Sequence, residues 1–450
     1  MRGRPKGWLA AAASNCTCER SWDRTIGAVP PMNPARRRIW QARCLPYPEA
    51  DGESGLEKRG VPVEDARSRM KTTTRARTHL RRRDFVIGST LALGGACLGV
   101  AGPETRVKIG FAGLKHGHVY SVLKLAAADP RVSIVALADD DEQNRKEGER
   151  VSGLPVKYAN YRQLLESEPL DAVVVCEEYG RRGEAAIAAL EAGKHVFSDK
   201  PLCTREEELE RIATLAAGKR LEVHVDFSLR HFWAKAAPAL QQGDIGEIVG
   251  CTFAGPHSLS YERRPKWYFA PGMHGGILND LMGHGVDFVH WITRRPYVEV
   301  LSGVAARVGF PQQPAFETSG DAFYQLQGGA TVFGHVDYLA PTGHPGGWRC
   351  GIVGTKGDAV VSDREGFTLR PSGAEERHSD AKALRADSPH PFKDFIDLLT
   401  EGKAPLRTTA ESLHVSQATL LAQAAAESGK THVAFPALAT GAREDGSSQP

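Results

Sequence analysis

A glycine-rich turn between two short apolar runs constrains the fold of this chain more than any other feature. The first run, residues 107–111, leads into the turn at 113–118, and a helical pattern follows over 119–128. The second run, residues 133–138, ends at Asp139. Apolar runs of this length are typical of strands buried on both faces, and two of them joined through a helix form a parallel βαβ unit.

The same alternation continues as far as residue 227. We expect strands over 171–176, 195–198 and 221–227, and helices over 183–192 and 204–217. Thr204, followed three residues later by Glu207, predicts a capping box for the last of these helices. Alternation of this length predicts an α/β fold that begins with a Rossmann-type, doubly wound parallel sheet.

The turn and the acid after the second run indicate a dinucleotide site. Glycines let the backbone approach a pyrophosphate, and Asp139 is placed to accept both hydroxyls of a ribose. No arginine follows Asp139 directly, which favours NAD, while Arg145 and Lys146 keep NADP open. The turn departs from a strict GxGxxG pattern at Lys115 and His118. The predicted cofactor-binding residues are Gly110, Gly113, Lys115, His116, Gly117, His118, Asp139, Cys176, Glu177, Lys200 and Pro201.

Two further segments carry residues suited to chemistry. Ser198-Asp199-Lys200-Pro201 follows a predicted strand, at the sheet edge where open α/β sheets bind ligands. In the segment 275–287, Asp280 and His284 are four residues apart and share one face of a helix. Asp287, three residues further on, is expected to be a structural hydrogen-bond partner.

With these segments the chain resembles the Gfo/Idh/MocA family of oxidoreductases over about residues 105–435. The resemblance rests on the glycine turn, on Asp199-Lys200-Pro201, on the run GDIGEI at 243–248 and on the pattern GGxxxDxxxHxxD from Gly275. It implies a second α/β domain with an open, mainly antiparallel sheet, which is often used for subunit contacts. A homo-oligomer assembled through that sheet is therefore expected.

The resemblance also implies that the catalytic residues are Lys200, Asp280 and His284. A histidine suits the removal of a hydroxyl proton near neutral pH, and a lysine ammonium stabilises alkoxide character. Asp280 would orient or bind a substrate hydroxyl, and lysine and histidine are able to exchange roles. We expect no metal, because a third ligand beside Asp280 and His284 is not evident.

One departure from the family pattern concerns the substrate. The strand ending at Cys176 is followed by Glu177-Glu178-Tyr179-Gly180-Arg181-Arg182, where the family has Thr-Pro-Asn and then a histidine, so that Arg182 takes the histidine position. Arginines there would bind an acidic substrate or pair with nearby glutamates. The candidate substrate residues are Arg182, Arg230 and Trp267.

The front of the chain resembles an export leader. Arg81-Arg82-Arg83 precedes the apolar run 85–101, which is shorter than the ~20 residues of a membrane span. Residues 70–103 are thus interpreted as a twin-arginine signal peptide, which implies the twin-arginine export machinery and a periplasmic location. A soluble arginine-rich helix is the alternative. Residues 1–69 lack periodicity, and we expect them to be a disordered leader or a mis-assigned gene start before Met70.

Composition excludes one class of partner. The formal net charge of +3 combines a strongly basic stretch over residues 1–83 with a mildly acidic remainder, which is not the footprint of a nucleic-acid-binding protein. The four cysteines after the leader have no metal-type spacing, so they are expected to be buried free thiols. They are Cys176, Cys203, Cys251 and Cys350.

The second half of the chain changes character. Short alternating runs at 322–326, 330–338, 351–353 and 359–362 predict antiparallel strands, and helices are expected over 390–399 and 410–428. We therefore expect the Rossmann domain over 104–227, a substrate and oligomerisation domain over 228–436, and a disordered tail over 437–450.

These observations predict an exported NAD(P)-dependent oxidoreductase that acts on a sugar, polyol or related hydroxy compound. Because free NAD is scarce outside the cytoplasm, the cofactor is expected to be tightly bound. Two alternatives stay open. One is an NAD-dependent glycosidase that works by transient oxidation and elimination, and the other is a non-catalytic nucleotide- or sugar-binding protein.

Overall fold

The computed structural model describes residues 106–341 and 347–438. The expected leader (1–69), the expected signal peptide (70–103) and residues 439–450 of the expected tail lie outside this part of the chain. Among the described residues, no helix combines the length and the apolar character needed to cross a bilayer.

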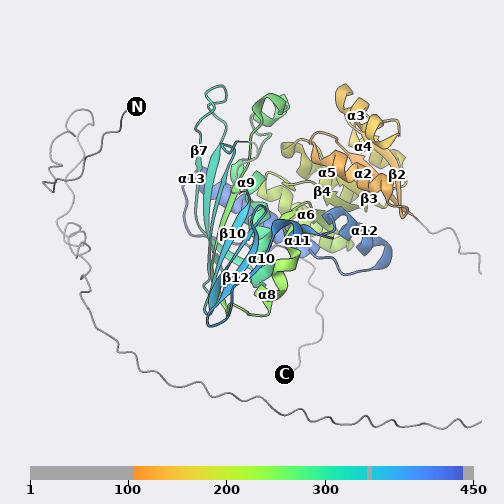
Figure 1. The fold of residues 1–450 in the computed structure, drawn as a ribbon. Helices are drawn as coiled ribbons and strands as arrows, with labels where there is room; N and C mark the ends of the chain where they lie inside the picture. Colours follow the sequence, from red (N-terminus) through yellow and green to blue (C-terminus); the bar gives the residue numbers. More distant parts are fainter. Residues whose placement is uncertain (1–105, 342–346, 439–450) are drawn as a thin grey trace, which may run out of the picture. The chain divides into compact units, whose positions relative to one another are not determined.

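The first half of the described chain forms a five-stranded parallel sheet. Its strands are β1 (Val107–Ala112), β2 (Val132–Ala138), β3 (Ala172–Val175), β4 (His195–Ser198) and β5 (Val223–Val225), in the order β2-β1-β3-β4-β5. All four pairings are parallel. The order runs outward in both directions from β1 and β3, which confirms the predicted doubly wound sheet (Figure 1).

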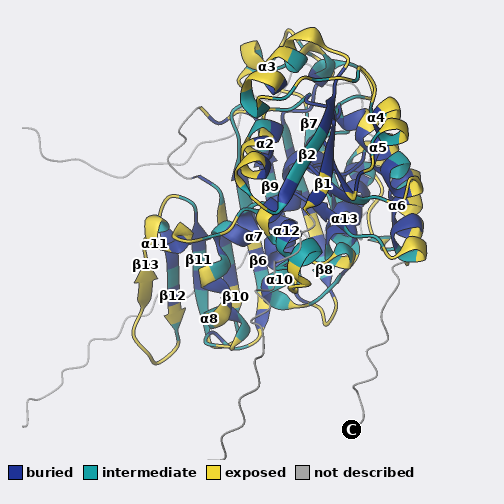
Figure 2. Cartoon of the chain, turned by 90° about the vertical axis from the view of Figure 1, so that its right-hand side faces the viewer, coloured by how far each residue is buried: buried dark blue, intermediate teal, exposed yellow. Residues whose placement is uncertain are grey.

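Helices cover both faces of this sheet. On one face, α2 (His118–Ala128) and α12 (Pro391–Glu401) share an apolar core with the strands, to which Leu123 and Phe395 contribute. On the other face lie α4 (Tyr161–Ser167), α5 (Tyr179–Glu191) and α6 (Glu206–Lys219). Helix α3 (Glu142–Ser152) packs beside α2. Figure 2 shows the strands buried between helices whose outer faces are exposed.

Two local predictions differ from the structure. Helix α5 begins at Tyr179, four residues before the predicted start. Helix α6 begins at Glu206 after Arg205, and the predicted capping box is wrong: no side chain caps this helix. Instead the Thr204 amide donates a hydrogen bond to Glu208 Oε2 at 3.3 Å, so the acid that serves the helix start lies one residue later than expected.

Gly110 is a packing residue. It lies inside β1, where a Cβ would stand 2.7 Å from Leu170 Cδ1 and 2.9 Å from Leu164 Cδ2. The absence of a side chain therefore lets α4 and the segment before β3 approach the sheet. This packing accounts for the glycine at position 110 without a cofactor, so the expected role of Gly110 in cofactor binding stays a prediction.

The second half of the chain forms a nine-stranded sheet in the order β13-β12-β11-β10-β6-β9-β8-β7-β14. Strands β6 and β9 pair in parallel, and the other pairings are antiparallel. This confirms the prediction of a mainly antiparallel sheet. The strands are β6 (Ile248–Pro256), β7 (Tyr297–Ala306), β8 (Ser319–Leu326), β9 (Thr331–Asp337), β10 (Arg349–Gly354), β11 (Gly357–Ser362), β12 (Gly366–Pro371), β13 (Arg377–Ser379) and β14 (Val433–Ala434).

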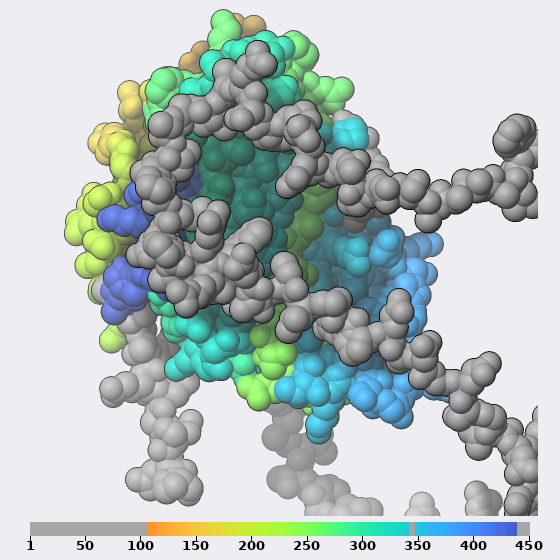
Figure 3. Space-filling view, turned by 90° about the vertical axis from the view of Figure 1, so that its left-hand side faces the viewer, coloured from red at the N-terminus to blue at the C-terminus, as the bar shows by residue number. Residues whose placement is uncertain are grey.

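Several helices of this half pack on the sheet. Among them are α9 (Ile277–Leu281), α10 (Gly283–Thr293) and α13 (Thr409–Ser428), which contact β8, β6 and β7 respectively. Thr408 and Glu411 form a capping box at the start of α13. Further helices of this half are α7 (Leu229–Phe232), η1 (Ala234–Ala236), α8 (Ala237–Gln241), η2 (Tyr261–Arg263), η3 (Lys266–Phe269) and α11 (Ala381–Arg385). Residues of β7 to β12 appear in teal to blue in Figure 3.

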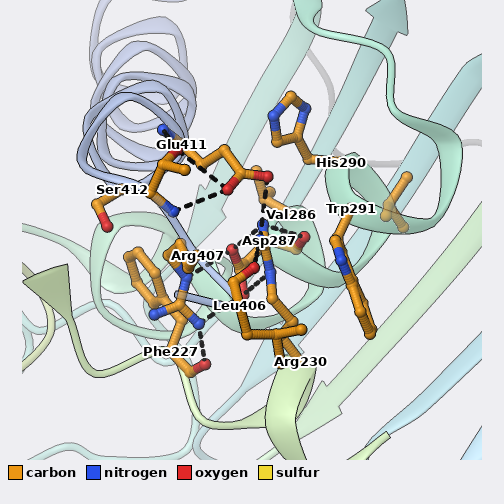
Figure 4. A network of polar contacts seen from close by, with 12 residues as sticks. Phe227, Arg230, Val286, Asp287, His290, Trp291, Leu406, Arg407, Glu411 and Ser412 are labelled. Atoms are coloured by element: carbon orange, nitrogen blue, oxygen red, sulfur yellow. Dashed lines mark hydrogen bonds and ion pairs between the residues drawn. The ribbon is translucent and has the colours of Figure 1, made fainter. Parts of the chain in front are cut away.

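A buried ion-pair network joins the two sheets' elements (Figure 4). Asp287 on α10 accepts hydrogen bonds from Arg230 Nε at 3.1 Å and Arg407 Nε at 2.9 Å. Arg407 also donates to the carbonyl oxygens of Val225 and Phe227 at the end of β5. Asp287 is thus the structural hydrogen-bond partner that was expected. The assignment of Arg230 to substrate is wrong, because its fully buried guanidinium is bonded to Asp287 and Glu411.

Candidate active site

The turn between β1 and α2 has the backbone features of a phosphate cradle. Gly113 has a φ of +83°, and a Cβ on it would lie 2.8 Å from the backbone nitrogen of Glu177, so glycine is required there. Gly117 has a φ of −59°, and a Cβ there would meet no protein atom within 4 Å. Helix α2 has no capping side chain and no acid in its first turn. Its positive end therefore opens onto free space, which fits a dinucleotide pyrophosphate.

Asp139 stands at the end of β2 as expected, but protein groups already engage its carboxylate. Oδ2 accepts a hydrogen bond from the Leu114 amide at 2.6 Å, and Oδ1 accepts one from the Asp141 amide at 2.8 Å. Lys115 Nζ lies 3.0 Å from Oδ1 and also pairs with Asp140. Although burial acts to lower it, the pKa of the Lys115 ammonium is raised by Asp140 and Asp139. A ribose at this position would meet a lysine–aspartate pair rather than a bare carboxylate.

Asp199, at the end of β4, holds the rings of both turn histidines. His116 Nδ1 lies 2.7 Å from Asp199 Oδ2, and His118 Nδ1 lies 3.1 Å from Asp199 Oδ1. Arg182 donates to Oδ2 at 2.9 Å. Although burial acts to raise it, the pKa of Asp199 is held well below its usual range by Arg182, His116 and His118. The predicted cofactor residue Cys176 is buried beside this group, with Sγ 3.8 Å from Oδ2.

Three of these side chains offer metal-type ligand atoms, which lie within 4.8 Å of one another in His116, His118 and Asp199. The expectation from the sequence was that no metal is bound. The single carboxylate of the group is already paired with Arg182. A second cation on the same carboxylate would be repelled, so we interpret the group as a hydrogen-bonded brace between the turn and β4.

Arg182 is a structural residue, and its assignment to substrate is wrong. The guanidinium is fully buried, donates to the carbonyl oxygens of Glu177 at 3.1 Å and Pro201 at 3.1 Å, and also donates to that of Lys200. Its Cζ lies 4.4 Å from the centroid of the Tyr179 ring. Through these contacts and its pair with Asp199, Arg182 holds the segment after β4 in place. Its guanidinium is buried among protein groups and is not exposed to a ligand.

Lys200 and Asp280 form a buried ion pair between the two motifs. Lys200 Nζ lies 2.5 Å from Asp280 Oδ1 and donates to the Asp280 carbonyl oxygen at 3.1 Å. Both side chains are buried. Although burial acts to raise it, the pKa of Asp280 is held well below its usual range, chiefly by Lys200. Two residues that the sequence assigned to catalysis are thus in direct contact, with the aspartate ionised.

A cluster of phenols completes the surroundings of Asp280. Tyr268 OH donates to Asp280 Oδ2 at 2.9 Å, and Tyr338 OH donates to the same oxygen. His274 Nε2 lies 3.0 Å from Tyr338 OH and 3.6 Å from Asp280 Oδ2. Each oxygen of the carboxylate therefore has a fixed partner, and Lys200 is held by a rigid counter-charge.

His284 lies near this pair without bonding to Asp280. The motif is divided between two helices, because α9 ends at Leu281 and α10 begins at Gly283. The imidazole packs edge-on against Phe227 and Trp348, and its buried Nδ1 has no hydrogen-bond partner among the described residues. Burial and then Lys200 lower the pKa of His284 to about 3. The imidazole of His284 is therefore neutral at physiological pH, and its Nδ1 is not hydrogen-bonded to any described residue.

Two further predicted residues border the same region. Glu177 is buried, and burial followed by the charge of Asp139 raises its pKa to about 7. Trp267 is partly buried, with its ring centroid 5.2 Å from that of Tyr179. The sequence had placed Glu177 at the cofactor and Trp267 at the substrate, and both lie against residues of the site.

Three residues of the site were not identified from the sequence. Tyr338 follows β9, His257 follows β6, and Tyr179 opens α5, so none shares a motif with Lys200 or Asp280. Tyr179 is fully buried, and its OH has no partner among the described residues. An isolated tyrosine or histidine at the end of a strand carries no local signal. The pairing of β6 with β9 brings His257 and Tyr338 to the same end of the nine-stranded sheet, whereas Tyr179 comes from the five-stranded half.

Comparison with known proteins agrees with this architecture. A model described as an oxidoreductase family with an NAD-binding Rossmann fold matches residues 107–227, and the GFO/IDH/MocA C-terminal domain matches residues 233–360. The two matches together take in more than half of the chain. An oxidoreductase domain protein from Kribbella flavida has the same fold, with a TM-score of 0.64 and 22% identity over 74% of this chain and 100% of that chain.

Curated relatives are similar in sequence over shorter stretches. Levoglucosan dehydrogenase of Pseudarthrobacter phenanthrenivorans is 27% identical over 51% of this chain and 60% of its own length. An inositol 2-dehydrogenase/D-chiro-inositol 3-dehydrogenase of Shouchella clausii is 36% identical over 32% of this chain and 40% of its own length. The chain thus spans 40% to 60% of the length of these two relatives. It belongs to the Gfo/Idh/MocA family, with oxidoreductases and dehydrogenases among its relatives and structural neighbours.

Proposed function

We propose that this protein is an NAD(P)-dependent oxidoreductase that transfers hydride at a hydroxyl carbon of a sugar, polyol or related compound. The observation that carries the proposal is the Lys200–Asp280 ion pair, which lies at the carboxyl end of β4 in the same sheet whose β1 ends in the glycine turn. Ligands bind at that edge of open α/β sheets. The activities named for the dehydrogenase relatives support the substrate class.

Each residue of the site would have a separate role in such a reaction. The nicotinamide, when bound, accepts or returns the hydride. Lys200 polarises the substrate oxygen, and its ammonium stabilises the charge that develops as the proton leaves. Asp280, whose own pKa is held well below its usual range, pairs with Lys200 and keeps it in position. His284 is the candidate acceptor of the hydroxyl proton, because its Nδ1 has no partner among the described residues. Since burial and Lys200 lower its pKa to about 3, it would act as a base only once a bound ligand offsets these effects.

Export and assembly form the second part of the proposal. The twin-arginine pattern in residues 81–83 supports export of the folded, cofactor-loaded protein to the periplasm. A homo-oligomer through the nine-stranded sheet is supported by apolar side chains exposed on it. These include Val304, Phe323, Phe333 and Val353, and Phe323 is paired across strands with Phe333.

The first experiment is to purify the protein without added nucleotide, denature it and identify any released dinucleotide by mass spectrometry. Stoichiometric NAD or NADP supports the proposal and selects the cofactor. A protein that is empty, and that also fails to bind either dinucleotide when it is supplied, overturns the proposal in favour of a non-catalytic binding protein. Release of an aglycone from glycosides without net reduced cofactor would instead favour the glycosidase alternative.

A further inference from the structure

Arg264 is a partly buried cation beside the catalytic pair, and no carboxylate of the described chain pairs with it. Its Nε donates to the Leu259 carbonyl oxygen at 2.9 Å, and its Cζ lies 4.4 Å from the centroid of the Tyr268 ring. The same tyrosine donates to Asp280. The guanidinium is therefore stacked on a ring that touches the catalytic aspartate, with its terminal nitrogens unused by the described protein.

The fully buried arginines of the described chain, unlike Arg264, are each paired with a carboxylate. Arg182 is paired with Asp199, and both Arg230 and Arg407 are paired with Asp287. A guanidinium removed from water is stabilised by a carboxylate or phosphate in its plane, and leaving one unpaired is costly. Arg264 is partly buried beside the candidate active site, and Asp280 acts on it electrostatically without bonding to it. A guanidinium in this position, with no bonded carboxylate among the described residues, indicates that a ligand supplies the anion.

His257 connects Arg264 to the catalytic lysine. Burial, followed by the positive charge of Lys200 and a smaller effect of Arg264, lowers the pKa of His257 to about 4. Both cations therefore lie within electrostatic reach of this ring. Its Nδ1 lies 2.7 Å from the Ser258 carbonyl oxygen, which only accepts hydrogen bonds, so Nδ1 carries the proton and Nε2 is an acceptor.

Lys200 and Arg264 both act electrostatically on His257, and Tyr268 contacts both Arg264 and Asp280, so the three side chains are candidates to contact one ligand. Lys200 serves the reacting oxygen, His257 Nε2 accepts a neighbouring hydroxyl proton, and Arg264 offers two terminal nitrogens to an anionic group. We propose that the substrate is an anionic sugar or polyol, which bears a carboxylate or a phosphate, and that Arg264 is the residue that selects it. This inference rests on the proposed oxidoreductase function, whose substrate class it narrows.

The test compares hexoses that share a pyranose ring and differ in the neutral or charged group at C6. Binding of D-glucuronate, glucose 6-phosphate and D-glucose is measured by calorimetry on the dinucleotide-loaded protein, with the hexose series replaced by inositol and its phosphate in a second panel. We expect an anionic member to bind at least about tenfold tighter than its neutral counterpart, and to lose that advantage in Arg264→Gln. Comparing the affinity for the carboxylate ligand with that for the phosphate ligand then shows which anionic group the site prefers. Equal or tighter binding of the neutral member overturns the inference.

A matched variant separates selection from general effects. Arg263 is the exposed neighbour of Arg264, so Arg263→Gln removes the same charge from the same loop and should keep the preference for the anion. Arg264→Lys retains the charge without the planar fork and should recover part of the loss. Thermal unfolding of each variant checks the fold. If the loaded protein oxidises neutral polyols and Arg264→Gln changes nothing, this inference fails while the proposed function stands; a protein that binds no dinucleotide removes both.

Discussion

Asp280 Oδ1 lies 2.5 Å from Lys200 Nζ, and this contact joins the end of β4 to helix α9, 80 residues further along the chain. The two residues are far apart in sequence, so the pair exists through the packing of the nine-stranded sheet and its helices against the five-stranded one. Tyr268 and Tyr338 fix the second carboxylate oxygen. Lys200 is thereby bonded to a carboxylate that is itself fixed, at the edge where a nicotinamide and its substrate would meet.

Replacing the lysine should separate chemistry from binding. Lys200→Met keeps the length of the side chain and removes the ammonium, so kcat should fall by about 10²–10⁴ while the protein still folds and binds dinucleotide. Turnover is followed by formation of reduced cofactor, and binding by fluorescence titration. Lys266→Met, on the exposed face of η3, is the matched control. Activity of Lys200→Met equal to that of the parent protein would remove the proposed mechanism.

The glycine turn offers a pair of substitutions with different consequences. In Gly113→Ala the new Cβ meets the Glu177 backbone at a positive φ, so both thermal stability and dinucleotide affinity should decrease. In Gly117→Ala the Cβ meets no protein atom, so stability should be unchanged while affinity falls. Melting temperatures without nucleotide and dissociation constants from titration distinguish the two. Unchanged affinity in both variants would place the cofactor elsewhere.

The buried network around Asp287 should be worth several kcal/mol. Asp287→Asn leaves Arg230 and Arg407 without their shared counter-charge, and the free energy of unfolding should fall by about 3–5 kcal/mol. Glu411→Gln removes the partly exposed partner of Arg230 and its reciprocal cap on Thr408, so a loss of about 1 kcal/mol is expected. Urea denaturation measures both. Equal effects would show that the aspartate is not the centre of the network.

Glu177 should make stability depend on pH in an unusual direction. Its pKa is raised from the ordinary value of 4.5 to about 7, first by burial and then by Asp139, so the folded protein keeps this proton where the unfolded chain loses it. The resulting stability is fully present below pH 4.5 and is lost as the pH rises through about 7. Glu177→Gln removes this dependence.

The measurement for Glu177 is urea denaturation at a series of pH values without nucleotide. Relative to the parent protein, Glu177→Gln should gain stability between pH 4.5 and 7 and keep that gain at pH 8. The same variant should bind dinucleotide more tightly at pH 8, because it removes a negative charge beside the pyrophosphate cradle. A difference between the two proteins that is constant across this range would mean that Glu177 does not titrate there.

Much of the fold was predictable from local pattern. The alternation of apolar runs and helical stretches over 107–227 determined the parallel sheet, because each strand and helix carries its own periodicity. The predicted strand over 195–198 coincides with β4, while the boundaries of α5 and α6 were wrong by one to four residues. Helix ends depend on capping contacts such as that of Glu208 with Thr204, which are not apparent from periodicity.

The residue types of the site were likewise determined by the sequence, through the motifs around Lys200, Asp280 and His284, and Lys200 and Asp280 do meet. Only the tertiary structure decided which arginines are available. Arg182 and Arg230 look like ligand-binding residues in the sequence, yet Asp199 and Asp287 neutralise them inside the protein. Arg264 has no paired carboxylate in the part of the chain that the structure describes. The physical reason is that a charge acquires its role from its counter-charge, and the counter-charges here come from residues 17 and 57 positions away.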